Sequence, residues 1–423
     1  MKILLPVHYF SDDPQSGFNT ELWNFPSQLA KKGYEVFIVT TASHLVHETK
    51  KSLAEKNIYL YQIYNFKNHG LGYTEALMTF LFSVWLRLFH KFDWIFVLDA
   101  AKTPFSRFKL GAKLAGRIFI PETPEMLEFF NSGDWKYDRS HKDESEGIDT
   151  ARAPFIYRCF RFLAYRIWYK VFPIKNIAEN ADLLFTQGKE PLEYARSMGR
   201  KNPVYLPNVV QPSWFDDFDG KIIDNNEKFV FLFIGRILKS KGIFNLIPVF
   251  NSLAKKYPKI ELWIVGPSNG FYTDLLKQAV NGFEDKIKIL GPKNHDEVTR
   301  HIMSCDVVVD PFTYASFSTV ALEALYCKKP IIAPLLGDTK DVVKEGITGY
   351  LVDSRKPEQL MAKMEQCITN YAEALELAKN GHEVVKKFFT CDKTAEIIDA
   401  NFCFYGDREK LDVINKNYEN LRD

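Results

Sequence analysis

The sequence predicts an α/β protein made of two doubly wound, Rossmann-like domains. Three observations predict this class. First, short apolar runs alternate with amphipathic segments along the chain. Second, this alternation stops near residues 203–228 and then starts again. Third, the 423 residues amount to about two to three usual domain lengths. Strands that alternate with helices along a chain form parallel sheets. We therefore expect two parallel sheets, each with its own core.

The first half of the chain contains one complete series of these elements, and we assign residues 1–212 to an N-terminal domain. A polar stretch without periodicity at about 131–153 predicts a flexible insertion in this domain. The prolines and polar residues from 203 onward predict a linker to the second half. The expected strands are 2–7, 35–41, 94–98, 117–120 and 181–186, and the expected helices are 21–32, 74–89 and 108–115.

The second half repeats the alternation and is assigned to a C-terminal domain at residues 213–390. The remaining segment, 391–423, is polar and helical in character, and we expect it to pack back on the N-terminal domain. The expected strands are 229–234, 261–265, 287–290, 307–310 and 330–333, and the expected helices are 244–256, 272–280, 296–303 and 318–327.

Composition and charge narrow the function classes. The 55 basic and 53 acidic side chains give a net charge of +2, so the whole molecule has no long-range attraction for nucleic acid. The six cysteines form no CxxC pair, which favours reduced thiols over disulfides or a zinc site. The apolar start at 1–6 is too short for a signal peptide, and the apolar run 76–88 is shorter than the about 20 residues of a spanning helix. We expect a cytoplasmic protein.

A glycine turn and several cations follow the first strand of the second half. Gly235 and Arg236 come directly after that strand, and Lys241 precedes the next helix. Glycine lets the backbone approach a ligand, and fixed cations at the carboxyl end of a parallel strand suit a pyrophosphate. Gly266 ends the following strand and is expected at the same edge of the sheet. The alternative interpretation is a plain turn with charges in solvent.

Taken together, these motifs resemble glycosyltransferase family 4 over about residues 228–368. The weaker resemblance of the first half rests on 1–6, 16–18, 29–36 and 181–182. The resemblance implies the GT-B architecture, in which two Rossmann-like domains face a cleft, the second domain holds a nucleotide-sugar donor and the first binds the acceptor. It also implies retention of anomeric configuration without a required metal. The motifs that carry it are Gly235-Arg236, Lys241-Gly242, 262–267, 305–311, 322–324, Lys329-Pro330 and 345–352 (EGITGYLV).

The family's site residues can be carried over to matching positions. Arg236 and Lys241 would be catalytic, because they would bind the donor diphosphate and stabilise the departing nucleotide. Glu323 would accept hydrogen bonds from the ribose hydroxyls. Ser318 and Thr319 would face a phosphate at a helix N-terminus, although ordinary helix capping explains them equally well. The expected donor-binding residues are Gly17, Gly235, Arg236, Lys241, Gly266, Ser316, Phe317, Ser318, Thr319 and Glu323.

The sequence departs from the family pattern at two places. Ala315 stands where the family has the first of two glutamates, so the sugar could differ, its contact could move to Ser316 or Ser318, or activity could be lost. Glu122 follows a predicted strand where many members have a histidine near the sugar, and it could contact sugar or acceptor. Asp99 could do the same, with helix capping as the alternative.

A basic, aromatic segment at 155–175 predicts an amphipathic helix. Such helices can lie on anionic membranes and bring a transferase to a lipid-linked acceptor, although packing under the first domain would equally bury the apolar face. Membrane contact through this helix would make the protein a peripheral protein on the cytoplasmic face of the membrane.

The sequence thus predicts a retaining, metal-independent glycosyltransferase without a cofactor. The donor would be a UDP- or GDP-sugar, and the acceptor a hydroxyl of a glycan or glycolipid in cell-surface polysaccharide or lipopolysaccharide biosynthesis. One alternative is a catalytically silent GT-B subunit that partners an active transferase. Another is an epimerase or phosphorylase on the same fold.

Overall fold

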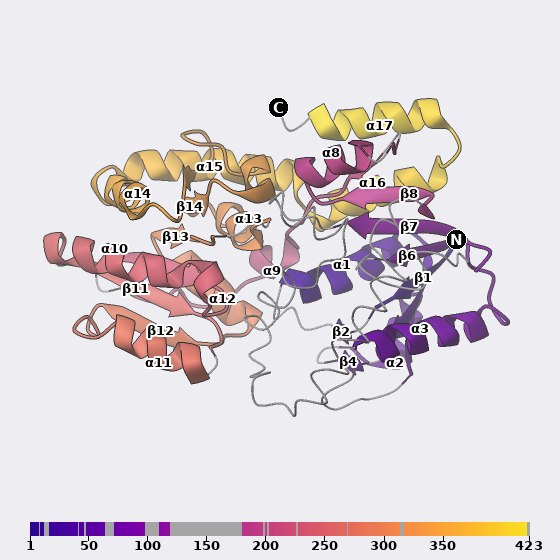
Figure 1. The fold of residues 1–423 in the computed structure, drawn as a ribbon, viewed down its shortest axis with the longest axis horizontal. Helices are drawn as coiled ribbons and strands as arrows, with labels where there is room; N and C mark the ends of the chain where they lie inside the picture. The colour runs from indigo at the N-terminus through magenta and orange to yellow at the C-terminus, as the bar shows by residue number, and fades with distance from the viewer. Residues whose placement is uncertain are drawn as a thin grey trace. The chain divides into compact units, whose positions relative to one another are not determined.

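In the computed structural model, the chain divides into two compact units, Met1–Pro207 with Thr394–Asp423, and Asn208–Lys393 (Figure 1). The structure describes residues 1–7, 9–11, 17–40, 42–45, 48–63, 72–97, 110–118, 180–197, 199–200, 203–225, 227–268, 270–313 and 317–420.

Within the described residues, the first unit contains a seven-stranded parallel sheet in the order β5-β3-β1-β6-β7-β8-β9. Two short strands, β2 and β4, pair beside it. The strands are β1 Lys2–Pro6, β2 Tyr9–Ser11, β3 Glu35–Thr40, β4 Ala42–His44, β5 Ile58–Gln62, β6 Trp94–Val97, β7 Lys113–Ile118, β8 Leu183–Thr186 and β9 Val204–Tyr205. The helices are α1 Gly17–Lys31, α2 Lys50–Glu55, α3 Gly72–Leu86, α8 Lys189–Ser197, α16 Cys391–Cys403 and α17 Arg408–Asn420.

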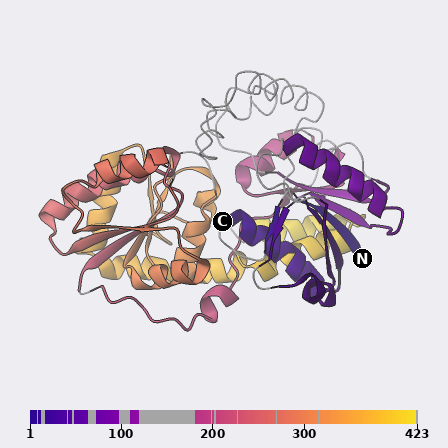
Figure 2. The ribbon, with the colours of Figure 1, turned by 90° about the horizontal axis from the view of Figure 1, so that it is seen from below.

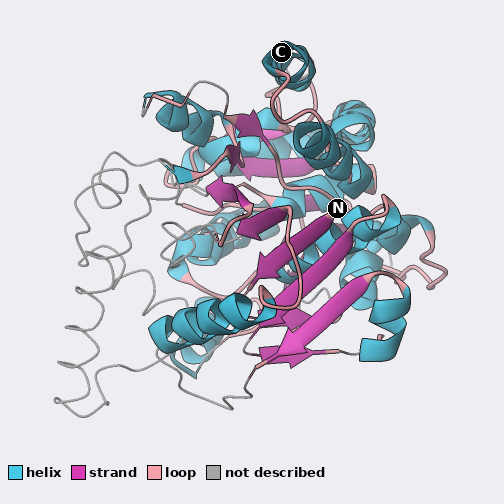
Figure 3. Ribbon diagram, turned by 90° about the vertical axis from the view of Figure 1, so that its right-hand side faces the viewer, coloured by secondary structure: helices cyan, strands magenta, loops and turns pink. Residues whose placement is uncertain are grey.

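Strand β1 shows why an unbroken apolar run forms the centre of this sheet. Ile3 and Leu5 belong to the core on the side of α1 and α16, whereas Leu4 belongs to the core on the side of α3 and α8. A strand buried on both faces has no polar alternation, because both of its faces lie under helices. Figure 3 shows the strands of this sheet side by side with helices on either side of it.

The C-terminal segment is part of the core of the first unit. The Phe402 ring of α16 stacks on Trp94 with centroids 4.3 Å apart, and it also contacts Phe96 edge to face at 6.1 Å. The Tyr405 hydroxyl donates to Asp182 over 3.2 Å. The segment after residue 394 therefore closes one face of the N-terminal sheet.

The second unit contains, within the described residues, a six-stranded parallel sheet in the order β12-β11-β10-β13-β14-β15. One core joins the sheet to α10, α11 and α14, and the other joins it to α12, α13 and α15, so helices cover both faces (Figure 2). The strands are β10 Phe229–Ile234, β11 Ile260–Val265, β12 Ile287–Gly291, β13 Val307–Val309, β14 Ile331–Pro334 and β15 Tyr350–Val352. The helices are α9 Ser213–Asp216, α10 Ile243–Lys256, α11 Gly270–Ala279, α12 His295–Ser304, α13 Thr319–Tyr326, α14 Pro357–Thr369 and α15 Tyr371–Phe388, with 3-10 helices η3 Lys239–Lys241 and η4 Gly337–Asp341.

Two sequence predictions in the first unit are wrong. The helix expected at 108–115 is contradicted by strand β7, because Lys113 to Gly116 pair in parallel register with β6 and the chain turns at Gly111 with φ +74°. The linker expected from 203 is in part strand β9, which pairs with β8, and Leu206 after it is buried. The insertion at 131–153 and the basic segment at 155–175 lie outside the described residues.

Candidate functional site

The strand order of the second sheet reverses between β10 and β13. Strands β11 and β12 lie on one side of β10, whereas β13, β14 and β15 lie on the other. Helices that leave two adjacent strands toward opposite faces open a crevice at the carboxyl ends of those strands, and open α/β sheets bind ligands there. The loop of Gly235 and Arg236 follows β10, and Asp310 follows β13. The candidate site is therefore this edge of the second unit.

Close backbone contacts fix the loops of this edge against one another. Gly242 has φ +74°, and a Cβ at this position would lie 1.8 Å from the carbonyl oxygen of Pro311. Gly266 has φ +146°, and its Cβ would lie 1.9 Å from the carbonyl oxygen of Gly235. Only glycine tolerates both the positive φ and the approach. The loop after β10 is thus held between the chain after β11 and the chain after β13.

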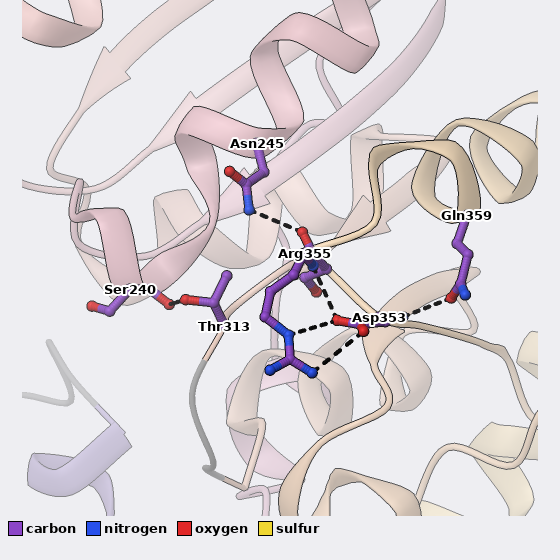
Figure 4. A network of polar contacts seen from close by, with 7 residues as sticks. Ser240, Asn245, Thr313, Asp353, Arg355 and Gln359 are labelled. Atoms are coloured by element: carbon purple, nitrogen blue, oxygen red, sulfur yellow. Dashed lines mark hydrogen bonds and ion pairs between the residues drawn. The ribbon is translucent and has the colours of Figure 1, made fainter.

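Hydrogen bonds add to these contacts (Figure 4). The Thr313 hydroxyl donates to the carbonyl oxygen of Ser240 over 3.3 Å, as Figure 4 shows, and the Thr313 amide donates to the same oxygen over 2.9 Å. These bonds join the loop after β13 to η3. The Asn245 amide group donates to the carbonyl oxygen of Ser354 over 2.9 Å, which joins the first turn of α10 to the loop after β15. Loops from four strands therefore form one connected edge.

Helix α13 begins at this edge with Ser318 as its N-cap. The Ser318 hydroxyl accepts from the Ala321 amide over 2.9 Å and donates to Asp310 Oδ2 over 2.5 Å. The Ser318 amide donates to the hydroxyl of buried Thr339 in η4 over 3.1 Å. The first-turn amides of a helix have no acceptor within the helix, and together with the helix dipole they favour an anion. The start of α13 thus contributes positive potential to the edge.

Burial and neighbouring charges shift the pKa values of two carboxyl groups at this edge. Burial raises the pKa of Asp310, whereas the Lys241 ammonium and the Ser318 hydroxyl act in the opposite direction. Burial, followed by the Asp310 carboxylate, raises the pKa of Glu323 to about 7. Among the described residues, no hydrogen bond or ion pair holds the Glu323 carboxylate. Glu323 is therefore a half-buried acceptor that a ligand with hydroxyl donors can engage.

Two cations belong to the same edge. Arg236 directly follows the β10 turn and its side chain is exposed. Lys241 ends η3, and its Nζ lies 5.6 Å from the centre of the Phe312 ring. An anion bound at this edge would thus meet fixed positive charge from one loop and helix amides from another, which is the arrangement that suits a diphosphate.

The structure places most of the predicted site residues in this second unit. Gly235, Arg236, Lys241 and Gly266 lie in loops after β10 and β11, and Ser318, Thr319 and Glu323 lie at or in α13. Gly17 begins α1 of the first unit. Asp99, Glu122 and Ser316, together with the departure at Ala315, lie outside the described residues.

The Phe317 ring lies in the core of the second unit. It is 6% exposed and packs against Phe389 with ring centroids 6.2 Å apart. Its side chain therefore anchors the chain before α13 in the core and is not exposed to a ligand.

Sequence reasoning did not select Asp310 and Thr339 as site residues. Asp310 interrupts an apolar run directly after Val307–Val309, and a charge at the end of a buried strand was the available signal. Thr339 carries no such signal, because its role depends on η4 lying beside α13.

The described part of the chain contains no group of three or more histidine, cysteine, aspartate or glutamate side chains placed to hold a metal ion. The metal-independent reaction stays a prediction. No described helix combines the length and apolar character needed to cross a bilayer.

Comparison with known proteins agrees with this geometry. Residues 215–420 match the family model described as glycosyl transferases group 1. An uncharacterized glycosyltransferase of Methanocaldococcus jannaschii is 28% identical over 175 residues, which cover 41% of this chain and 48% of that protein. A D-inositol 3-phosphate glycosyltransferase of an Arthrobacter species is 36% identical over 133 residues, which cover 30% of this chain and 32% of that enzyme. The chain thus aligns with less than half the length of these relatives.

Solved structures resemble nearly the whole chain. HepE of Anabaena, crystallised with UDP, has a TM-score of 0.65 at 17% identity, covering 94% of this chain and 98% of its own. WaaG, a glycosyltransferase involved in lipopolysaccharide biosynthesis, has a TM-score of 0.65 at 15% identity, covering 94% and 99%. These likenesses show the GT-B fold with two Rossmann-like domains.

Proposed function

We propose that this chain, whose residues 215–420 match the family model of glycosyl transferases group 1, is a glycosyltransferase that uses a nucleotide-sugar donor. One observation carries the proposal. The cationic loop of Arg236 and Lys241, the N-terminus of α13 and the Glu323 carboxylate all lie at the carboxyl edge of one sheet, where its strand order reverses. These groups complement a diphosphate and a ribose, which are the two parts common to all such donors.

The mechanism we infer is electrostatic catalysis of leaving-group departure. Arg236 and Lys241 bind the diphosphate and stabilise the negative charge that develops on it as the bond to the sugar breaks. Glu323 accepts from the ribose hydroxyls and orients the nucleotide. In a retaining reaction of family 4 type, the acceptor hydroxyl attacks from the side of the leaving phosphate and gives its proton to that phosphate. No protein base and no metal ion is required in this scheme.

We propose a UDP-sugar as the first donor to test, with GDP-sugars second. HepE has been crystallised with UDP and with UDP-glucose, and it shares the GT-B fold. For the acceptor we propose a hydroxyl of a glycan or glycolipid in cell-surface polysaccharide or lipopolysaccharide biosynthesis, which the family resemblance and the WaaG likeness support.

The surface of α3 supports contact with a membrane, as the lipid-linked acceptor would require. Every exposed side chain between positions 78 and 89 is apolar, whereas a surface helix normally turns polar residues outward. Exposed apolar patches of this kind mark sites of protein or membrane contact. We call this surface the α3 face; its exposed residues are Met78, Leu81, Val84 and Trp85 of α3 and Leu88 and Phe89 of the turn that follows it.

The donor is tested by calorimetric binding of UDP, GDP and ADP and by slow hydrolysis of the corresponding diphosphate sugars. We expect one nucleotide to bind, Arg236→Ala to lower hydrolysis by about 100-fold, and Glu323→Ala to weaken binding. Arg355→Ala is the matched control, because Arg355 is an exposed arginine at the same sheet edge whose guanidinium is held by Asp353 (Figure 4). Binding without any turnover would instead favour the silent subunit, and no binding would refute the proposal.

The membrane contact is tested separately by sedimentation with phosphatidylglycerol vesicles. We expect the wild-type protein to co-sediment and Trp85→Glu to remain in the supernatant, because a charge on the α3 face opposes insertion. Ile222→Glu is the control, since Ile222 is also an exposed apolar residue but lies in the second unit. Equal sedimentation of both variants would exclude the α3 face as the contact.

A further inference from the structure

A carboxylate lies within the edge that we assign to an anionic ligand. Asp310 is only 4% exposed, and an isolated buried charge is strongly unfavourable. A negative charge at this position also repels a diphosphate. Its presence therefore requires a compensating role, and its contacts indicate which one.

The surroundings of Asp310 include both groups that would bind the diphosphate. Its Oδ2 accepts from the hydroxyl of Ser318, the same hydroxyl that caps α13 through the Ala321 amide. The loop of Asp310 is joined to the loop of Lys241, because Thr313 donates to the Ser240 carbonyl oxygen over 2.9 Å and Gly242 lies against Pro311. The Lys241 ammonium lowers the pKa of Asp310 and so opposes the rise caused by burial. One carboxylate thus contacts the helix cap and lies in the electrostatic field of the loop cation.

The backbone around Asp310 is fixed independently of its side chain. Its amide donates to the Ile332 carbonyl oxygen over 2.9 Å in β14. The next residue, Pro311, is in close backbone contact with Gly242, and Thr313 bonds to Ser240. The main chain of this loop is therefore held by other contacts, so that the carboxylate is left to orient side chains.

We propose that Asp310 is a positioning residue, which holds the Lys241 ammonium and the Ser318 cap in the relative orientation that binds the donor diphosphate. This inference rests on the proposed function and names a residue that acts within the same site. Asp310 would not itself contact the donor. It would act through Lys241 on one side and through the start of α13 on the other.

Two physical effects oppose each other when the charge is removed. Loss of a like charge near the diphosphate strengthens anion binding, because repulsion is removed. Loss of the positioning contact weakens it, because Lys241 and the helix cap lose their common partner. The sign of the change in nucleotide affinity therefore decides between a bystander charge and a positioning residue.

The test is calorimetric titration of UDP into Asp310→Asn, which keeps the shape and one acceptor atom but removes the charge. We expect the dissociation constant to rise about tenfold, in line with loss of a charge-assisted contact. Asp353→Asn is the matched control, because Asp353 is a carboxylate of the same sheet edge that pairs with Arg355. Asp353→Asn should change the dissociation constant for UDP by no more than about twofold.

Measuring the effect of Asp310→Asn in a Lys241→Ala protein separates a positioning role from general damage to the structure. With Lys241→Ala already present, the oriented cation is gone and mainly the repulsion remains, so adding Asp310→Asn should no longer weaken UDP binding and should strengthen it. The same reversal is not expected of damage to the fold, which would weaken binding in both backgrounds. Ser318→Thr, which retains the hydroxyl, should bind better than Ser318→Ala.

The outcomes distinguish this inference from the proposed function. The positioning role is supported if Asp310→Asn weakens UDP binding by the otherwise wild-type protein and does not weaken it when Lys241→Ala is also present. Equal or tighter binding by Asp310→Asn alone, or weaker binding in both backgrounds, overturns this inference while the proposed function stands. Failure of the wild-type protein to bind UDP, GDP and ADP overturns both.

Discussion

Replacement of Glu323 by glutamine should make the protein more stable at alkaline pH while it weakens donor binding. Glu323 is half-buried in α13 beside Asp310, and no hydrogen bond or ion pair among the described residues holds its carboxylate. Its ionised form is therefore less favourable in the folded protein than in the unfolded chain. Glutamine has nearly the same shape and carries no charge at any pH.

The magnitude follows from the pKa of this carboxyl. Its rise from the ordinary 4.5 to about 7 corresponds to about 3 kcal/mol of destabilisation once the group is ionised. Because Glu323 retains some contact with solvent, we reduce this to about 2 kcal/mol. For a unit of the size of Asn208–Lys393, that is a shift of about 4–8 °C in melting temperature.

The sign and the pH window follow from linkage. Because the folded-state pKa is raised, the wild-type protein carries no penalty below pH 4.5, loses stability as the pH rises toward about 7, and keeps that deficit above it. The variant lacks this dependence. Melting curves should therefore separate Glu323→Gln from wild type at about pH 8, and the two should nearly coincide at about pH 4.5.

The control is Glu383→Gln, at an exposed glutamate of α15 in the same unit. It should melt with the wild-type protein at both pH values, within about 1 °C. Equal melting of Glu323→Gln and wild type at alkaline pH, or a difference that does not change with pH, would show that the environment of Glu323 does not disfavour its charge.

Two further predictions concern the packing that supports the site and the fold. Gly242→Ala should lower the free energy of unfolding of the second unit by about 3 kcal/mol in urea, because the added Cβ would collide with Pro311. The control Gly346→Ala, at φ +67° with no atom near the added Cβ, should lower it by only about 1 kcal/mol. Phe402→Ala should lower the stability of the first unit by about 3–5 kcal/mol, because the stack on Trp94 is lost. The control Phe404→Ala, at a ring that is 38% exposed, should lower it by less than about 1 kcal/mol. Equal losses of stability would contradict the packing described for α16.

Five strands of the second sheet, β10 to β14, were predictable because their signal is local, whereas the short strand β15 was not predicted. The run Phe229 to Ile234 is apolar throughout, and β10 covers these residues because both faces lie under helices. Strand β7 carries no such signal. Its sequence KLAGRI contains good helix formers, and pairing with β6 and β8 overrides that preference. Strand β9 was hidden between prolines, and its two residues are strand only because β8 pairs with them.

The candidate site divides in the same way. The positions of Arg236, Lys241 and Glu323 relative to the sheet could be predicted from the motifs, because Arg236 follows β10, Lys241 precedes α10 and Glu323 lies within the predicted helix α13. The contact of Ser318 with Thr339 could not, since it joins residues on either side of β14 that only the folded sheet brings together. Sequence spacing identifies which loops reach the edge, whereas the contacts between those loops require the structure.

The electrostatics of the edge link fold stability to ligand binding. Asp310 and Glu323 are two carboxylates near each other, and the described cation that offsets Asp310 is Lys241. Hydrogen-bond donors on a ligand would favour the ionised form of Glu323 and so lower its pKa. A ligand that brings vicinal hydroxyls therefore relieves the penalty that Glu323 imposes on the free fold. Under the proposed function, the carboxylate that destabilises the second unit would also be the group that selects a ribose. A substitution that removes the stability penalty would then remove the selection as well.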